Sequence, residues 1–131
     1  MRKILFRGKR TKNGQWVTGL LWHHVDKASL IYSDELDDKV WVNPQTVGQF
    51  TGLTDKNGKK IFEGDIVEHH VQGDILVNRG VVNWDKENAR WAYRLNTMNP
   101  CFALYNPKTF EVIGNIHDNP ELLEVDSRGK N

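Results

Sequence analysis

The chain has 131 residues, a formal net charge of +1, one cysteine and 38% hydrophobic residues. This length suits one domain with a real hydrophobic core. A single cysteine excludes an intramolecular disulfide and a four-cysteine zinc site, and it favours an intracellular setting. No stretch resembles a secretory signal or a membrane span, so we expect a cytoplasmic protein with no membrane partner.

Charge is distributed unevenly along the chain. The first 16 residues contain no acidic residue and six basic ones, namely Arg2, Lys3, Arg7, Lys9, Arg10 and Lys12. The remaining residues are net acidic. Such a basic segment suits an acidic partner or an acidic region of the same molecule or of a neighbouring subunit.

Short runs of alternating apolar and polar residues predict strands, and long helical stripes are missing. The predicted strands cover residues 15–23, 38–43, 65–72, 75–84, 90–95, 101–105 and 110–116, with further short strands beside the turn at residues 57–58. Asn13-Gly14 and Asn57-Gly58 predict type I′ hairpin turns. Gly80 predicts a bulge or a sharp bend of the kind that curls a sheet into a barrel.

The end of the chain carries the one helical signal. In DNPELLEV, Asn119 is placed as a cap and Pro120 in the first turn, which predicts one or two helical turns. Residues 126–131 contain no apolar residue and predict a frayed tail. The fold predicted from the pattern is therefore all-β, built from hairpins, with a short C-terminal helical turn.

Several motifs together resemble the YopX family, small proteins of bacteriophages and of prophages in bacterial genomes. They are ILFRGK, NGQWVTG, VNPQTVGQFTGLTDKNGKKIFEGDIV, GVVNW and FEVIGNIHDNPELL, and the resemblance runs from Met1 to about Val125. It implies a mainly β fold, a phage or prophage origin in the cytoplasm of a bacterial host, and no established catalytic residue or cofactor. We therefore expect one YopX-like β domain over residues 1–125, with N-terminal hairpins (1–45), a central turn motif (46–67) and a barrel-like region (65–116).

The basic start suggests one binding function. Arg2, Lys3, Arg7, Lys9, Arg10 and Lys12, together with Trp16, are the residue types of a cationic groove with stacking rings, as in β-barrels that bind nucleic acid. Alternation divides the first strand, with Lys3 and Arg7 on one side and Arg2 on the other. No recognised nucleic-acid motif accompanies these residues.

A metal-dependent hydrolase is a further hypothesis. His69 or His70 with Glu63 or Asp65 would supply its ligands and carboxylates. Adjacent histidines in a strand point to opposite faces, so neither His23-His24 nor His69-His70 chelates one ion while the strand is regular. The favoured interpretation has no metal, no cofactor and no catalytic residue, with Asn57, Gly58, Glu63, Gly64 and Asp65 forming a structural turn motif.

The function we expect from the sequence is non-catalytic binding. Its leading version is self-association or binding to another phage or host protein, and its alternative is nucleic-acid binding through the basic first strand. We expect a sheet edge to be protected against uncontrolled pairing with another chain by the charges of Lys56, Lys59 and Lys60. The segments 69–79 and 87–100 match no family pattern and are the expected location of any chemistry peculiar to this protein.

Overall fold

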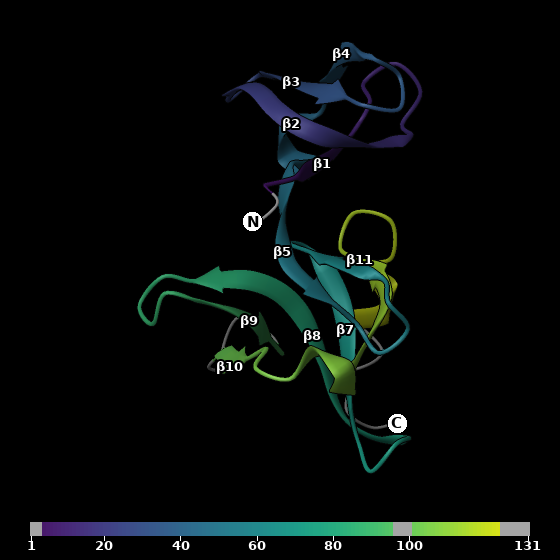
Figure 1. Cartoon of the computed structure of the whole chain (residues 1–131), viewed down its shortest axis with the longest axis vertical. Coiled ribbons are helices and arrows are strands. Elements are labelled where there is room, and N and C mark those ends of the chain that lie inside the picture. The colour runs from purple at the N-terminus through teal and green to yellow at the C-terminus, as the bar shows by residue number, and fades with distance from the viewer. Residues whose placement is uncertain (1–3, 96–100, 124–131) are drawn as a thin grey trace. The chain divides into compact units, whose positions relative to one another are not determined.

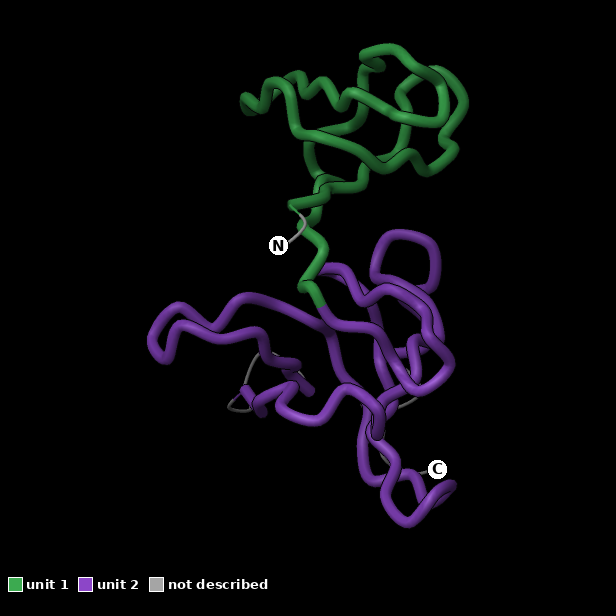
Figure 2. The backbone as a smooth tube through the Cα atoms, viewed as in Figure 1, with its two compact units in different colours: residues 1–52 green, residues 53–131 purple. Residues whose placement is uncertain are grey.

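The computed structural model describes residues 4–95 and 101–123. Backbone contacts divide the chain into two compact units, residues 1–52 (unit 1) and 53–131 (unit 2), each shown in its own colour in Figure 2. The division lies inside the predicted central turn motif. Arg2, Lys3 and the tail at 126–131 lie outside the described residues.

Unit 1 is built on antiparallel hairpins. Its strands are β1 (Phe6–Lys9), β2 (Trp16–Val25), β3 (Ala28–Ser33), β4 (Asp38–Val42) and the start of β5 (Gly48–Thr54), with a 3₁₀ turn η1 (Pro44–Thr46) before β5 (Figure 1). They hydrogen-bond in the order β4-β3-β2-β1-β5, and β5 pairs next with β6 (Lys60–Phe62).

The inner face of the unit 1 sheet forms a small apolar core. Val17, Ile31, Val40 and Val42 are buried there. The sheet is curved, because the end of β1 meets β4 through an Arg10↔Val42 bridge. Gly8 permits this approach, since a Cβ there would lie 2.9 Å from a methyl group of Val42.

Unit 2 contains a five-stranded antiparallel sheet in the order β10-β9-β8-β7-β11. Its strands are β7 (Asp65–Val71), β8 (Ile75–Asp85), β9 (Arg90–Arg94), β10 (Cys101–Ala103) and β11 (Phe110–Asn115), with a 3₁₀ turn η2 (Pro107–Thr109) (Figure 1). The core consists of Ile61, Val67, Val82, Tyr93, Leu104, Phe110 and Val112. A helical turn follows at residues 121–123.

The all-β prediction is confirmed, and each predicted strand overlaps an observed one. The strand β3 was not predicted. The described strands form open sheets and no closed barrel, so the barrel-like region is not confirmed. None of the helices in the described residues is long and apolar enough to cross a membrane.

The predicted turn chemistry needs two corrections. Type I′ turns require positive φ at both central residues, but only Gly14 and Gly58 have it, whereas Asn13 and Asn57 do not. At the second turn, the Gly58 amide donates to the Asp55 carbonyl at 3.0 Å, as in a type I turn followed by a left-handed glycine. Gly80 is also not the bulge, because the register shift lies between Leu76 and Asn78.

Candidate functional site

Alternation in unit 1 directs a set of large and basic side chains outward. Lys9 in β1 pairs with Trp16 in β2. Leu20 in β2 pairs with Tyr32 in β3, and Tyr32 pairs with Lys39 in β4. These positions therefore share the face of the sheet opposite the core. We call this surface the aromatic face; it comprises Arg7, Lys9, Trp16, Leu20, Trp22, Lys39 and Trp41. The exposed fractions are 53% for Leu20, 59% for Trp22 and 53% for Trp41, which is unusual for side chains of this size.

Cations lie directly over two of the rings on the aromatic face. The Arg7 guanidinium carbon is 4.6 Å from the centroid of Trp16, and the Lys9 ammonium is 5.7 Å from the same ring. The Lys39 ammonium is 4.7 Å from the centroid of Trp22. These distances are within the range of cation–π attraction. The face therefore combines positive charge with indole rings at two separate places.

The aromatic face has a positive electrostatic character with an acidic boundary. None of the outward positions in β1 to β4 is Asp or Glu. The boundary is the turn after β3, where Asp37 accepts a hydrogen bond from the Tyr32 hydroxyl. This hydrogen bond and the charge of Asp37 raise the pKa of Tyr32.

The structure brings together only part of the predicted basic cluster. Arg7 and Lys9 lie beside Trp16 as predicted. In contrast, Arg10 forms a backbone β-bridge with Val42 of β4, and Lys12 lies in the exposed turn that follows. Sequence reasoning missed Lys39 and Trp41. Their signal was present in the alternation of DKVWVN, in which both occupy the outward positions.

The predicted turn motif organises the backbone of unit 2. The buried Asp65 carboxylate accepts a hydrogen bond from the Phe62 amide at 2.7 Å. Gly64 has a φ of 91° and donates to the Val82 carbonyl at 2.9 Å. Glu63 is half-buried in the same turn.

Sequence reasoning missed Asp55, whose side chain is 1% exposed. One of its carboxylate oxygens accepts from the amides of Asn57 and Lys59 at 2.8 and 2.9 Å. The other accepts from the Val112 amide at 2.9 Å. Asp55 therefore fixes the hairpin turn between β5 and β6 and ties it to β11.

The two adjacent histidines of β7 have different surroundings, as alternation predicted. The His69 ring stacks on Phe110 with centroids 4.5 Å apart, and burial lowers the pKa of His69. His70 lies beside Glu68, with 3.1 Å between Nε2 and a carboxylate oxygen.

The metal set that the sequence suggested is not assembled within the described residues. Neither Glu63 nor Asp65 belongs to a group that could share an ion with His69 or His70. Glu68, His70 and Glu111 instead bring their ligand atoms within 4.8 Å of one another. Burial raises the pKa of Glu68, but hydrogen bonds from Arg79 and His70 outweigh it, so the pKa lies below its usual value.

The histidines of unit 1 form no comparable group among the described residues. His24 Nδ1 lies 2.6 Å from the hydroxyl oxygen of Ser29 across the β2–β3 hairpin. Because Ser29 is fully buried, this pair holds the hairpin and does not present a nucleophile to solvent.

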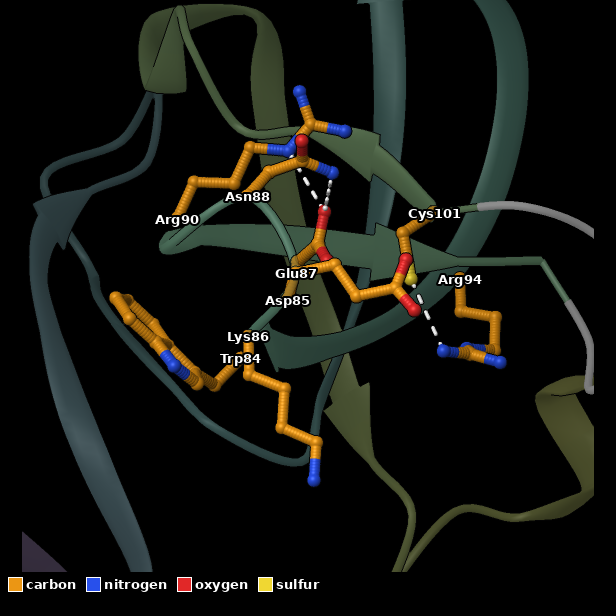
Figure 3. A pocket seen from close by; sticks show the side chains of 8 residues that line it. All are labelled: Trp84, Asp85, Lys86, Glu87, Asn88, Arg90, Arg94 and Cys101. Carbon is orange, nitrogen blue, oxygen red and sulfur yellow. Dashed lines mark hydrogen bonds and ion pairs between the residues drawn. The ribbon is translucent and has the colours of Figure 1, made fainter.

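A pocket of about 510 Å³ lies beside the β8–β9 turn and along β9 in unit 2, as Figure 3 shows. Its lining contains Trp84, Asp85, Lys86, Glu87, Asn88, Arg90, Arg94 and Cys101. Asp85 accepts hydrogen bonds from Asn88 and Arg90, both at 3.0 Å, and these hold its pKa below the usual value. Arg94 lies 3.2 Å from the Cys101 sulfur. Charges of both signs line the pocket, which favours no single class of ligand.

Comparisons with known proteins identify the family and the fold. The family model described as YopX protein matches residues 5–124. No curated protein matches the chain. The crystal structure of protein EF1440 from Enterococcus faecalis is similar, with a TM-score of 0.55 and 22% sequence identity over 94% of this chain and 99% of that one. At this identity the likeness shows a shared fold.

Proposed function

We propose a binding function for this chain, which belongs to the YopX family. The ligand we propose is single-stranded nucleic acid, bound on the aromatic face, and the chain carries out no reaction of its own. The observation that carries the proposal is the placement of cations against indole rings on one surface. Arg7 and Lys9 lie over the half-buried ring of Trp16, and Lys39 lies over the exposed ring of Trp22. The setting we propose is that of a phage or prophage accessory protein in the cytoplasm of a bacterial host.

The chemistry of the face suits an unpaired strand better than a duplex. Bases in a single strand offer free π-faces, and stacking on an aromatic side chain contributes about 1–3 kcal/mol per base. Trp22 and Trp41 supply exposed rings for such stacking. The cations beside the rings are placed to neutralise the phosphates that accompany each stacked base.

Binding to labelled single-stranded DNA and RNA, measured by fluorescence anisotropy at several salt concentrations, tests this function. With three cations on phosphates, the slope of log K against log salt is expected to be about −2. Trp22→Ala and Trp41→Ala should each weaken binding by roughly 5- to 150-fold. Trp84→Ala, which removes a partly exposed tryptophan of unit 2, is the matched control and should bind as the unmodified protein does.

Two results would contradict the nucleic-acid function. One is the absence of binding to either strand at low salt. The other is an equal loss of affinity in Trp22→Ala and Trp84→Ala. If Trp22→Ala instead abolishes an association between protein chains, the aromatic face is a protein interface.

A second candidate, self-association, is supported by the tip of the β7–β8 hairpin. Ile75, Leu76 and Val77 are exposed in succession there, with Val71 opposite them. Sedimentation velocity over a range of protein concentrations tests this candidate. Association that disappears in an Ile75→Ser, Val77→Ser double variant would support it, and a monomer at every concentration would refute it.

A further inference from the structure

Two adjacent strands of unit 2 place three metal-binding side chains on one face. Strand β7 is the neighbour of β11 in the sheet (Figure 1). Glu68 in β7 pairs directly with Glu111 in β11. His70 lies two residues after Glu68 and therefore shares its face. The ligand atoms of all three lie within 4.8 Å of one another. Strand register, and not a loop, fixes their spacing.

This arrangement leaves one negative charge without compensation. Carboxylates directly opposite each other on neighbouring strands repel. Arg79 neutralises Glu68, with 2.7 Å between Nη2 and Oε2. The Glu111 side chain, in contrast, makes no hydrogen bond or ion pair with any residue in 4–95 or 101–123. A half-buried carboxylate beside a second carboxylate and an imidazole favours a bound cation.

The donor set and the spacing define the class of cation. One imidazole and two carboxylates suit Zn²⁺ and similar divalent transition metals, and Ca²⁺ prefers oxygen ligands alone. Two donors that share a tetrahedral zinc ion at the usual bond lengths lie about 3.3 Å apart. Glu68 Oε1 and His70 Nε2 are 3.1 Å apart. This pair already has nearly the separation that a shared ion requires.

We propose that Glu68, His70 and Glu111 bind one Zn²⁺ ion or a similar divalent transition metal. The ion takes His70 Nε2 and one oxygen from each glutamate, and water completes its coordination. Arg79 donates hydrogen bonds to Glu68 Oε2, the carboxylate oxygen that does not bind the metal, and so orients the Glu68 side chain. Metal ligands are commonly oriented by such hydrogen bonds from neighbouring residues. Arg79 is itself held by the Leu122 carbonyl at 3.0 Å.

Lys56 competes with the metal for His70. Its ammonium lies 3.3 Å from His70 Nδ1, which therefore accepts while Nε2 donates to Glu68. Metal at Nε2 moves the ring proton to Nδ1, so Lys56 must turn away, toward the Gly73 carbonyl that it already approaches at 3.4 Å. Removing the Lys56 charge should therefore strengthen metal binding. This effect is not expected if Glu68, His70 and Glu111 only stabilise the fold.

Zinc binding to the full chain without an affinity tag, measured in competition with a chromophoric chelator, tests the site. We expect one ion per chain. Glu111→Gln should bind at least about tenfold more weakly and Lys56→Gln about threefold or more tightly. Glu111→Gln preserves size and removes no contact that supports the described fold, so it should still fold. His23→Gln, at an exposed histidine of unit 1, is the matched control.

A Co²⁺ titration adds a spectroscopic check, because four-coordinate cobalt with a protein nitrogen ligand absorbs visibly more strongly than the hydrated ion. The absorption should appear in the unmodified protein and in His23→Gln, and be lost in His70→Gln. The proposal is overturned if no stoichiometric zinc binding occurs. It is equally overturned if Glu111→Gln and His70→Gln bind zinc as the unmodified protein does.

Discussion

At the scale of single residues, buried carboxylates hold the turns of unit 2. Asp55 and Asp65 are each at most 2% exposed, and both accept hydrogen bonds from backbone amides. A buried amide that loses its acceptor incurs the full cost of desolvation. The stretch TGLTDKNGKKIFEGD is therefore explained by backbone geometry, and a catalytic role is not needed to account for it.

Asp55→Ala should lower the free energy of unfolding by about 3 kcal/mol or more, because three amides lose a charged acceptor. Asp55→Asn should also destabilise the protein, since its NH₂ group cannot accept from an amide. Urea denaturation measures both changes. Asp74→Ala, at an exposed position of the β7–β8 turn, is the control. An Asp55→Ala variant as stable as this control would refute the role of Asp55.

The half-buried His69 predicts a pH dependence of stability. Because its pKa in the folded state lies below the unfolded value of about 6.5, the unfolded state takes up the proton first. The contribution of His69 is thus fully present above pH 6.5 and is lost as the pH falls through the folded pKa. Thermal unfolding at neutral and mildly acidic pH should show this loss. His69→Phe should lose less stability over the same interval, and an identical loss would contradict the assignment.

At the scale of elements, alternation predicted most strands but failed at β3. In ASLIYS the inward positions include Ser29 and Ser33, which are buried, while Leu30 and Tyr32 face outward. Ile31 is the one apolar residue among the inward positions of β3, so the hydrophobic pattern does not mark the buried face of this segment. The aromatic face was only partly predictable for a related reason. Lys39 and Trp22 come together through the register of three strands, which the local pattern does not specify.

Gly80 makes a close contact between β8 and β9. A Cβ at this position would lie 2.6 Å from the Arg94 carbonyl oxygen, and this backbone atom cannot move aside without disturbing the sheet. Gly80→Ala should lower the free energy of unfolding by about 2 kcal/mol. Val77→Ala, at an exposed position of the same strand, should change it far less. Chemical denaturation compares the two, and equal stabilities would show that the sheet absorbs the extra methyl group.

At the scale of the whole molecule, the near-neutral charge hides a difference between the units. Residues 1–52 contain eight Lys and Arg against five Asp and Glu, whereas residues 53–131 contain ten against twelve. The sequence revealed the basic start, but not that Arg10 and Lys12 leave the face while Lys39 joins it. Placement of single charges, and not their total, therefore decides what the surface attracts.

Two charge reversals separate placement from total charge. Lys39→Glu and Lys86→Glu both change the formal net charge from +1 to −1. Lys39 lies on the aromatic face, whereas Lys86 lies in unit 2. Lys39→Glu should therefore weaken oligonucleotide binding by roughly tenfold or more, and Lys86→Glu by less than about threefold. Equal losses in the anisotropy titrations would mean that net charge, and not the aromatic face, governs the attraction.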